Sequence, residues 1–169
     1  MRITGGTARG RALRGRLPEG VRPTSARVRE ALFSMLGQDL SNLSFLDAYG
    51  GSGLIGLEAW SRGAQVVVYE RNRETARWIE RQGAAMGATW TVRVANVLRA
   101  ADHFDIVYAD PPYSSDPEPV LAHLSTLTRR DLVIETARSA RLPEATALVK
   151  LVTERRYGAT RVWRYRRKD

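Results

Sequence analysis

The residues best suited to chemistry are Asp110, Pro111, Pro112 and Tyr113, which directly follow an apolar run over 104–109. Two prolines end a strand, because proline cannot donate to a sheet ladder and restricts the preceding residue to extended backbone. Asp110 and the Pro111 carbonyl could then accept both hydrogens of a planar amino group, while Tyr113 stacks on the attached ring. The alternative is a loop that only ends the strand.

A second motif lies upstream, where an apolar run ends at Asp47 and is followed by Gly50, Gly51 and Gly53. Glycines permit positive φ and close approach of a ligand, and the helix expected next offers free N–H groups. Another strand then ends in Glu70, an acid placed to bind ribose hydroxyls. Taken alone, this spacing also fits a dinucleotide-binding fingerprint.

Two features favour S-adenosylmethionine over a nicotinamide or flavin. Asp47 closes the first strand where a dinucleotide would bring a phosphate, whereas a carboxylate there suits the ammonium group of a methionine. The Asp110 loop supplies acceptors for an amino group, which a hydride transferase does not need. The sequence therefore predicts transfer of a methyl group to an amino nitrogen.

The composition limits the remaining possibilities. A chain of 169 residues is long enough for one domain with a proper core. It has no cysteine and only two histidines, so we expect no disulfide and no metal site. No apolar run approaches the length of a membrane span, and the first residues do not form a signal peptide. A soluble, cytoplasmic protein is expected.

The net charge of +9 is concentrated at the two ends of the chain. Residues 1–29 carry eight arginines and one acid, and residues 155–169 carry six arginines, one lysine and one acid. The residues between them have a charge of −4. A general preference for arginine over lysine would not separate the charges in this way, so we expect a nucleic-acid partner.

The elements that must position these residues follow an alternating pattern. Residues 1–24 are expected to form a small basic β-hairpin arm, followed by a methyltransferase domain over 25–169. Thr24 or Ser25 would cap a helix over 26–37. Strands are expected at 43–48, 65–70, 90–95, 104–109 and 131–136, and helices at 54–62, 72–86 and 117–127. This order predicts a doubly wound α/β sheet with ligands at the strand ends, and strands at 147–156 and 160–167 add a C-terminal antiparallel hairpin.

Beyond these patterns, four stretches in order resemble the RsmD-type 16S rRNA (guanine-N2-)-methyltransferase family, whose target is guanine-966. The opening Arg2-Ile3-x-Gly5-Gly6-x-x-Arg9-Gly10-Arg11-x-Leu13 and the segment Arg22-Pro23-Thr24-x-x-Arg27-Val28-Arg29-Glu30 are the more specific ones. The glycine motif and the Asp110 loop are shared with many methyltransferases. The resemblance implies a Rossmann-like class I fold, S-adenosylmethionine as methyl donor, and 16S rRNA or the small ribosomal subunit as partner.

The resemblance also implies roles for individual residues. The catalytic set is Asp110, Pro111, Pro112 and Tyr113, and the cofactor set is Asp47, Tyr49, Gly50, Gly51, Gly53, Glu70, Arg71, Asn96 and Val97. Asn96 would lie near the adenine, although the residue alone fits a turn equally well. RNA docking is expected from Arg9, Arg11, Arg22, Arg27 and Arg29. A monomer without a metal is expected.

Two other interpretations stay open. The same loop could serve an amino-methyltransferase of another target, such as adenine N6 or a protein glutamine, although the basic ends argue against a protein substrate. The chain could also be an rRNA-binding assembly factor whose methyl transfer is dispensable. Asp47, Glu70 and Asp110 are all present, which argues against the loss of chemistry.

Overall fold

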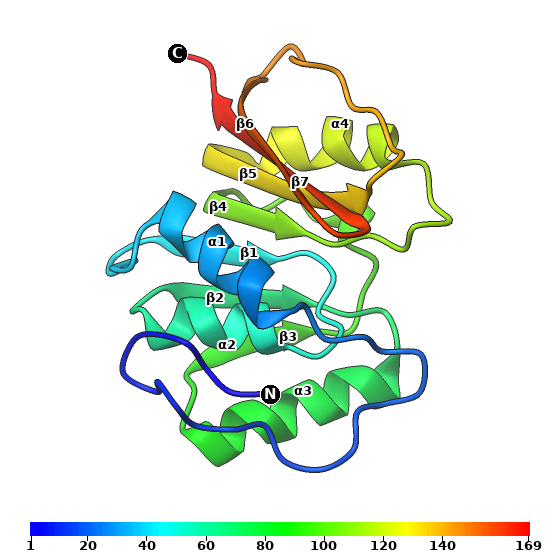
Figure 1. The fold of residues 1–169 in the computed structure, drawn as a ribbon. Helices are drawn as coiled ribbons and strands as arrows, with labels where there is room; N and C mark the ends of the chain where they lie inside the picture. Colours follow the sequence, from blue (N-terminus) through cyan, green and yellow to red (C-terminus); the bar gives the residue numbers. More distant parts are fainter. The chain divides into compact units, whose positions relative to one another are not determined.

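The computed structural model describes residues 1–169, which form seven strands, four α-helices and one short 3-10 helix (Figure 1). In chain order these are α1 (Ala26–Leu36), β1 (Ser44–Asp47), α2 (Leu54–Ser61), β2 (Gln65–Tyr69), α3 (Arg73–Met86), β3 (Trp90–Arg93), η1 (Val97–Arg99), β4 (Phe104–Ala109), α4 (Pro117–Leu127), β5 (Thr128–Ala137), β6 (Val149–Tyr157) and β7 (Thr160–Arg167). The contacts divide the chain into two units, Met1–Val97 and Leu98–Asp169. None of the helices has the length and apolar character needed to cross a membrane.

The first unit is built on a parallel sheet in the order β3-β2-β1. Strand β2 is a nearly continuous apolar run, as expected where helices cover a parallel sheet, and Leu46 of β1 pairs with Val67 of β2. Helix α2 packs on β1 and β2, and α3 packs on β3. Helix α1 contributes Phe33, whose ring stacks on Phe45 of β1 with centroids 6.4 Å apart.

The second unit combines a parallel pair with the expected antiparallel hairpin. Strands β4 and β5 are parallel, β5 and β7 are antiparallel, and β7 continues into an antiparallel pair with β6. In Figure 1 the hairpin is the orange and red pair, and α4 lies along β5. Gly158 forms the hairpin turn with a φ of 58°. Parallel strands with helices and a C-terminal hairpin confirm the α/β class predicted from the sequence.

Capping side chains set the helix boundaries close to their predicted positions. Ser25, rather than Thr24, caps α1 by accepting a hydrogen bond from the backbone N–H of Val28 at 3.3 Å. Asn72 caps α3 through the N–H of Thr75 at 3.0 Å, and Asp116 caps α4. Each cap satisfies a backbone donor that the first helical turn leaves open.

Three predicted boundaries were wrong by two residues or more, and one of them is the start of β6, which lies at Val149 instead of residue 147. Strand β5 begins at Thr128 instead of residue 131, because Thr128 is at once the C-cap of α4 and the first extended residue, and its hydroxyl donates to the carbonyl of Leu124 at 2.8 Å. Strand β3 ends at Arg93 instead of residue 95, and the 3-10 helix η1 after it was not predicted. Such one-turn elements have no clear hydrophobic period.

The N-terminal arm (residues 1–24) is not the regular β-hairpin that was predicted. A single bridge joins Arg2 to Ala12, supported by hydrogen bonds between Ile3 and the backbone of Gly10 and Arg11 at 2.8 and 2.9 Å. The glycines of its turn have positive φ, a backbone conformation that residues with a side chain rarely adopt. The arm also contributes to the core, since Ile3 and Leu13 are buried.

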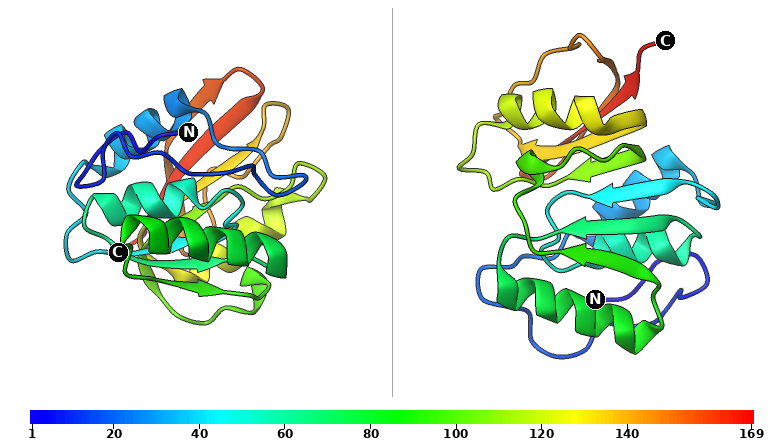
Figure 2. Two further views of the ribbon diagram at one scale, coloured as in Figure 1. Left: turned by 90° about the horizontal axis from the view of Figure 1, so that it is seen from below. Right: turned by 180° about the vertical axis from the view of Figure 1, so that it is seen from behind.

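Helices α2 and α3 hold the arm in place (Figure 2). The N–H of Thr7 donates to the carbonyl of Ser61 at the end of α2 at 2.7 Å. The backbone of Arg14 exchanges two hydrogen bonds with the Gln82 side chain of α3, at 2.8 and 2.9 Å. These polar contacts take the place of ladder bonds and explain why the arm is ordered without being a sheet. Its role as a separate RNA-docking domain stays a prediction.

Candidate functional site

The glycine loop between β1 and α2 forms the first part of the candidate site. Asp47 is buried at the end of β1, and its Oδ2 accepts the N–H of Gly56 in the first turn of α2 at 3.1 Å. The N–H of Gly50 donates to the carbonyl of Tyr69 at 2.8 Å, and that of Gly53 donates to Gly50 at 2.7 Å. The loop is therefore tightly closed beside a buried carboxylate.

The three glycines are required for different reasons. A methyl group on Gly50 would lie 2.8 Å from Val68 and 2.7 Å from Ile79, and one on Gly53 would lie 3.0 Å from Ile79. Packing excludes a side chain at Gly50, and at Gly53 a φ of 72° disfavours one in addition to the close contact. At Gly51 the nearest atom would be a backbone oxygen 3.8 Å away, and the φ of 55° is what demands glycine. Gly51 thus has the open side at which a ligand can approach the backbone.

Glu70 follows β2 and closes this loop. Its carboxylate accepts the N–H of Gly51 at 3.1 Å and the N–H of Asn72 at 2.8 Å. Two backbone donors fix its orientation, and a carboxylate has further lone pairs for ribose hydroxyls. Glu70 is half-buried, so it can reach both the loop and a ligand.

The other predicted cofactor residues border the same unit with different exposures. Tyr49 is half-buried, and burial raises the pKa of its hydroxyl while the positive charge of Arg71 opposes that rise. Tyr49 and Arg71 are therefore close enough to interact. Asn96 is exposed after β3, and Val97 is buried at the start of η1. Their predicted contacts with an adenine stay predictions.

These residues fit S-adenosylmethionine by their chemistry. The buried carboxylate of Asp47 suits the methionine ammonium, and the Glu70 carboxylate suits a ribose diol. The open backbone at Gly51 lies between them in the chain and is joined to Glu70 by a hydrogen bond. The cofactor residues and the Asp110 loop fall in different units. The geometry that would bring the two together stays a prediction.

The second part of the candidate site is the loop after β4. Pro111 is buried, whereas Pro112 and Tyr113 are exposed, Tyr113 by 53%. The hydroxyl of Tyr113 lies 2.8 Å from the hydroxyl of Thr160 at the start of β7. A fixed hydroxyl on an exposed aromatic residue is what a stacking platform for a planar base requires.

Asp110 is half-buried and is paired with the buried carboxyl of Glu135, a pairing that the sequence did not reveal. Burial raises the pKa of Asp110 to about 6. Burial and the neighbouring charge of Asp110 raise the pKa of Glu135, on β5, to about 8. The hydroxyl of Tyr108 donates to Glu135 at 2.6 Å, and this hydrogen bond opposes the rise in the pKa of Glu135. At neutral pH the pair therefore retains one proton and one negative charge.

A signal for Glu135 was present in the sequence. It is the acid that ends the apolar run Leu132-Val133-Ile134 of β5, and a carboxyl continuing such a run is usually paired or protonated. The parallel register pairs Ala109 with Ile134 and so brings Glu135 level with Asp110. That proximity depends on strand order, which the local pattern does not contain.

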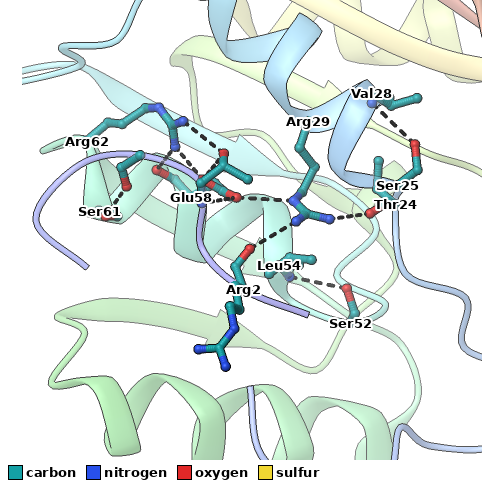
Figure 3. A network of polar contacts seen from close by, with 12 residues as sticks. Arg2, Thr24, Ser25, Val28, Arg29, Ser52, Leu54, Glu58, Ser61 and Arg62 are labelled. Carbon is teal, nitrogen blue, oxygen red and sulfur yellow. Dashed lines mark hydrogen bonds and ion pairs between the residues drawn. The ribbon is translucent and has the colours of Figure 1, made fainter. Parts of the chain in front are cut away.

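Arg29 was predicted to bind RNA, and the structure contradicts this. Its side chain is buried, its Nε lies 3.1 Å from Oε1 of the buried Glu58, and it donates to the carbonyls of Arg2 and Thr24 (Figure 3). Arg62 completes the network from the other side of Glu58. Arg29 joins α1 and the arm to α2, and its buried guanidinium is not accessible to RNA.

The other predicted RNA-binding arginines, Arg9, Arg11, Arg22 and Arg27, are exposed. Arg11 has a structural duty as well, because it donates to the carbonyls of Ala85 and Met86 at the end of α3, at 2.9 and 2.8 Å. Such contacts satisfy carbonyls that a helix terminus leaves open. Contact of these four residues with RNA stays a prediction.

Comparison with known sequences gives related proteins. A family model described as "Conserved hypothetical protein 95" matches residues 1–166. "Ribosomal RNA small subunit methyltransferase D" of Escherichia coli K12 is 36% identical over 120 residues, which cover 67% of this chain and 60% of that protein. The match thus spans less than two thirds of the relative. YlbH of Bacillus subtilis, proposed to be an rRNA methyltransferase, is 27% identical over 99% of this chain and all of its own length.

Solved structures similar to this chain are also described as methyltransferases. An Escherichia coli protein, YhhF, proposed to be a methyltransferase, superposes with a TM-score of 0.86 at 30% identity, covering 99% of this chain and 98% of that one. A magnesium protoporphyrin IX methyltransferase from Synechocystis with bound S-adenosylmethionine gives a TM-score of 0.69 at 15% identity, covering 84% and 79% of the two chains. The second likeness concerns the fold alone, which is the class I methyltransferase fold.

Proposed function

Because the chain belongs to the family described as conserved hypothetical protein 95, the RsmD-type family that its sequence resembles, we propose that it methylates rRNA. The methyl group comes from S-adenosylmethionine, and the acceptor is the exocyclic N2 of a guanine in the 16S rRNA of the small ribosomal subunit. The observation that carries the proposal is the Asp110 loop, in which a half-buried carboxyl and an exposed aromatic residue lie three residues apart.

The cofactor supplies an electrophilic methyl group and a neutral thioether as leaving group. Asp47 balances the charge of its ammonium, and Glu70, oriented by Gly51 and Asn72, accepts from its ribose. The open backbone at Gly51 lets the cofactor approach closely. All three features belong to the first unit.

The Asp110 loop would act on the acceptor base. The amino group of guanine is a poor nucleophile because its lone pair is delocalised into the ring. Hydrogen bonds from both N–H groups to Asp110 and the Pro111 carbonyl favour a pyramidal nitrogen and balance the positive charge that develops on it. The proton released from N2 passes to the Asp110 carboxylate, whose raised pKa of about 6 suits a base near neutral pH.

Tyr113 would hold the base outside its helix. A base must leave its stack before its amino group can reach a buried carboxylate, and stacking on an aromatic ring offsets part of that cost. The ring of Tyr113 is exposed, and its orientation is set by Thr160. Asp110 and Tyr113 thus combine hydrogen bonding with stacking in one loop.

The test is transfer of radiolabelled methyl groups to undermethylated small subunits and to free 16S rRNA, followed by nucleoside analysis. We expect N2-methylguanosine. Methylated adenine would overturn the guanine assignment, and label in protein would overturn the RNA assignment. Bound cofactor without any transfer would favour the assembly-factor interpretation.

The first variant to test is Asp110→Asn, which keeps the shape of the side chain and removes its charge. We expect the rate of methyl transfer to fall at least about 100-fold while cofactor affinity stays within about twofold, because the carboxylate acts on the acceptor. Asp116→Asn is the matched control, since asparagine caps a helix as well as aspartate does. A near-normal rate in Asp110→Asn would refute the mechanism.

A further inference from the structure

Charge is divided unequally between the two faces of the β6–β7 hairpin. Side chains alternate along each strand, and directly paired residues of antiparallel strands share a face. The pairs Lys150 with Arg166 and Arg155 with Val162, and the spacing of Arg164, place four cations on one face, because a bulge between Leu151 and Thr153 shifts the alternation of β6 by one residue. We call Lys150, Arg155, Arg164 and Arg166 the basic face. No acid of the hairpin shares it.

The single acid of the hairpin, Glu154, lies on the opposite face. It forms ion pairs there with Arg161 at 3.2 Å and Arg156 at 3.4 Å. An acid of the hairpin itself therefore neutralises charge only on this opposite face, and the carboxylate that pairs with the basic face comes from β5. Two arginines of that face also have other contacts within the protein, since Arg161 is buried and Arg167 donates to the carbonyls of Ser125 and Thr128.

A buried carboxylate fixes part of the basic face in place. Asp131 of β5 is fully buried and lies 3.0 Å from Arg164 and 3.4 Å from Arg166, while Arg130 approaches its other oxygen at 3.0 Å. One negative charge against three guanidinium groups leaves a positive excess. The Arg166 side chain is 52% exposed, so its remaining N–H donors face solvent. Pre-oriented side chains lose less entropy when they bind a partner.

One end of the basic face adjoins the loop that holds Tyr113. Thr160, whose hydroxyl lies 2.8 Å from that of Tyr113, is on the same face of β7 as Arg164 and Arg166. The six residue steps from Thr160 to Arg166 span roughly 20 Å of extended strand. This is long enough to lie along several phosphates of one RNA strand.

We propose that the basic face binds the sugar-phosphate backbone of single-stranded rRNA adjoining the target base. The inference rests on the proposed function, because it takes Tyr113 as the platform for that base. Guanidinium groups match phosphate geometry, and a line of cations leading to an aromatic ring is how proteins hold a single strand. The N-terminal arginines predicted to bind RNA belong to the other unit, so the hairpin is an additional surface.

The test compares two double variants that remove the same charge. Arg155→Gln with Arg166→Gln alters the basic face, and Arg77→Gln with Arg81→Gln alters exposed positions on α3. Arg164 is left in place because it neutralises the buried Asp131. Binding of a fluorescein-labelled single-stranded 16S rRNA fragment is measured by anisotropy at several salt concentrations.

We expect the hairpin variant to bind RNA about 25-fold more weakly at 0.1 M salt, about fivefold for each lost phosphate contact, and to reduce the salt slope by about 1.4. The control pair should change affinity less than about twofold. Equal weakening by the control pair, or an unchanged salt slope, would overturn the proposal. Duplex DNA binding as tightly as the RNA, with the same loss in the hairpin variant, would also overturn it.

Three further measurements distinguish a loss of RNA contacts from a folding defect and from a failure of the proposed function. Cofactor affinity and the unfolding midpoint should match those of the unmodified protein. If the double variant is unstable, Arg155→Gln alone, whose guanidinium forms no ion pair, should still weaken RNA binding about fivefold. Hairpin-dependent RNA binding without methylation of any RNA would refute the proposed function and leave the surface standing.

Discussion

Glu135 and Tyr108 give Asp110 surroundings that affect its ionisation, which an exposed loop would not do. Two neighbouring carboxyls, one buried and one half-buried, do not both ionise readily, so one keeps its proton and the other carries the charge. The Tyr108 hydroxyl donates to Glu135 and fixes its orientation. Glu135 is therefore a positioning residue that acts through Asp110.

Glu135→Gln tests this role through the pH profile. In the unmodified protein, activity should rise as Asp110 ionises near pH 6 and change again as Glu135 ionises near pH 8. Glutamine mimics the protonated acid, so the variant should stay within about threefold of normal activity at pH 7 and lose the upper transition. Initial rates from pH 5 to 9 provide the measurement.

The sign of the accompanying stability change follows from the same pair. Both folded-state pKa values are raised, so the folded protein holds more protons than the unfolded chain between about pH 4 and 8. The free energy of unfolding contributed by the pair is present below this window and is lost as the pH rises through it. Glu135→Gln should flatten that decline, and an identical decline in both proteins would contradict the pairing.

The residues of the site differ in how far the sequence could predict them. Asp110 was predictable because two prolines mark the strand end locally. Glu135 was not, because its partner comes from a neighbouring strand. Arg29 was misjudged, although Phe33 and Leu36, four and seven positions further on, put it on the apolar stripe of α1.

Among the elements, the network around Glu58 joins three segments that are distant in sequence. Glu58 of α2 is fully buried and binds Arg29 of α1, Arg62 at the end of α2, and the backbone N–H of Thr4 in the arm. A buried carboxylate with several donors is stable only while all of them remain. The network therefore makes the placement of α1 and that of the arm depend on each other.

Arg29→Ala should lower the free energy of unfolding by about 3 kcal/mol, because it leaves Glu58 with an incomplete set of partners. Arg22→Ala, on the exposed part of the arm, should change it by no more than about 0.5 kcal/mol. Urea denaturation of both variants is the measurement. Equal stability of the two would show that Arg29 is not a structural residue.

The order of the elements was largely predictable, because alternating apolar runs and capping residues are local signals. The bounds of β4, α4 and β7 agree with the predicted ranges. The N-terminal arm was not predictable in the same way. Its hydrogen bonds go to Ser61 and Gln82, so its structure depends on helices that follow it by more than fifty residues.

On the scale of the whole molecule, positive charge is carried at both ends of the chain, while residues 30–154 are net negative. RNA affinity should therefore fall steeply between about 50 and 300 mM salt, because bound phosphates displace counterions. Cofactor affinity should change little over the same range, since its contacts involve few charges. Parallel titrations with both ligands provide the measurement, and an equal salt dependence of the two would count against a polyanionic substrate.

Trp78 gives the docked N-terminal arm an optical signal. Its indole N–H donates to the backbone carbonyl of Arg16 at 3.1 Å, and the ring is almost fully shielded from water. Release of the arm would expose the indole and move its fluorescence to longer wavelength. Because the chain has four tryptophans, the signal of Trp78 is the part of the emission that is lost in Trp78→Phe. The arm's attachment can thus be followed in solution without a label, and a rearrangement on adding RNA would shift the wavelength of that emission.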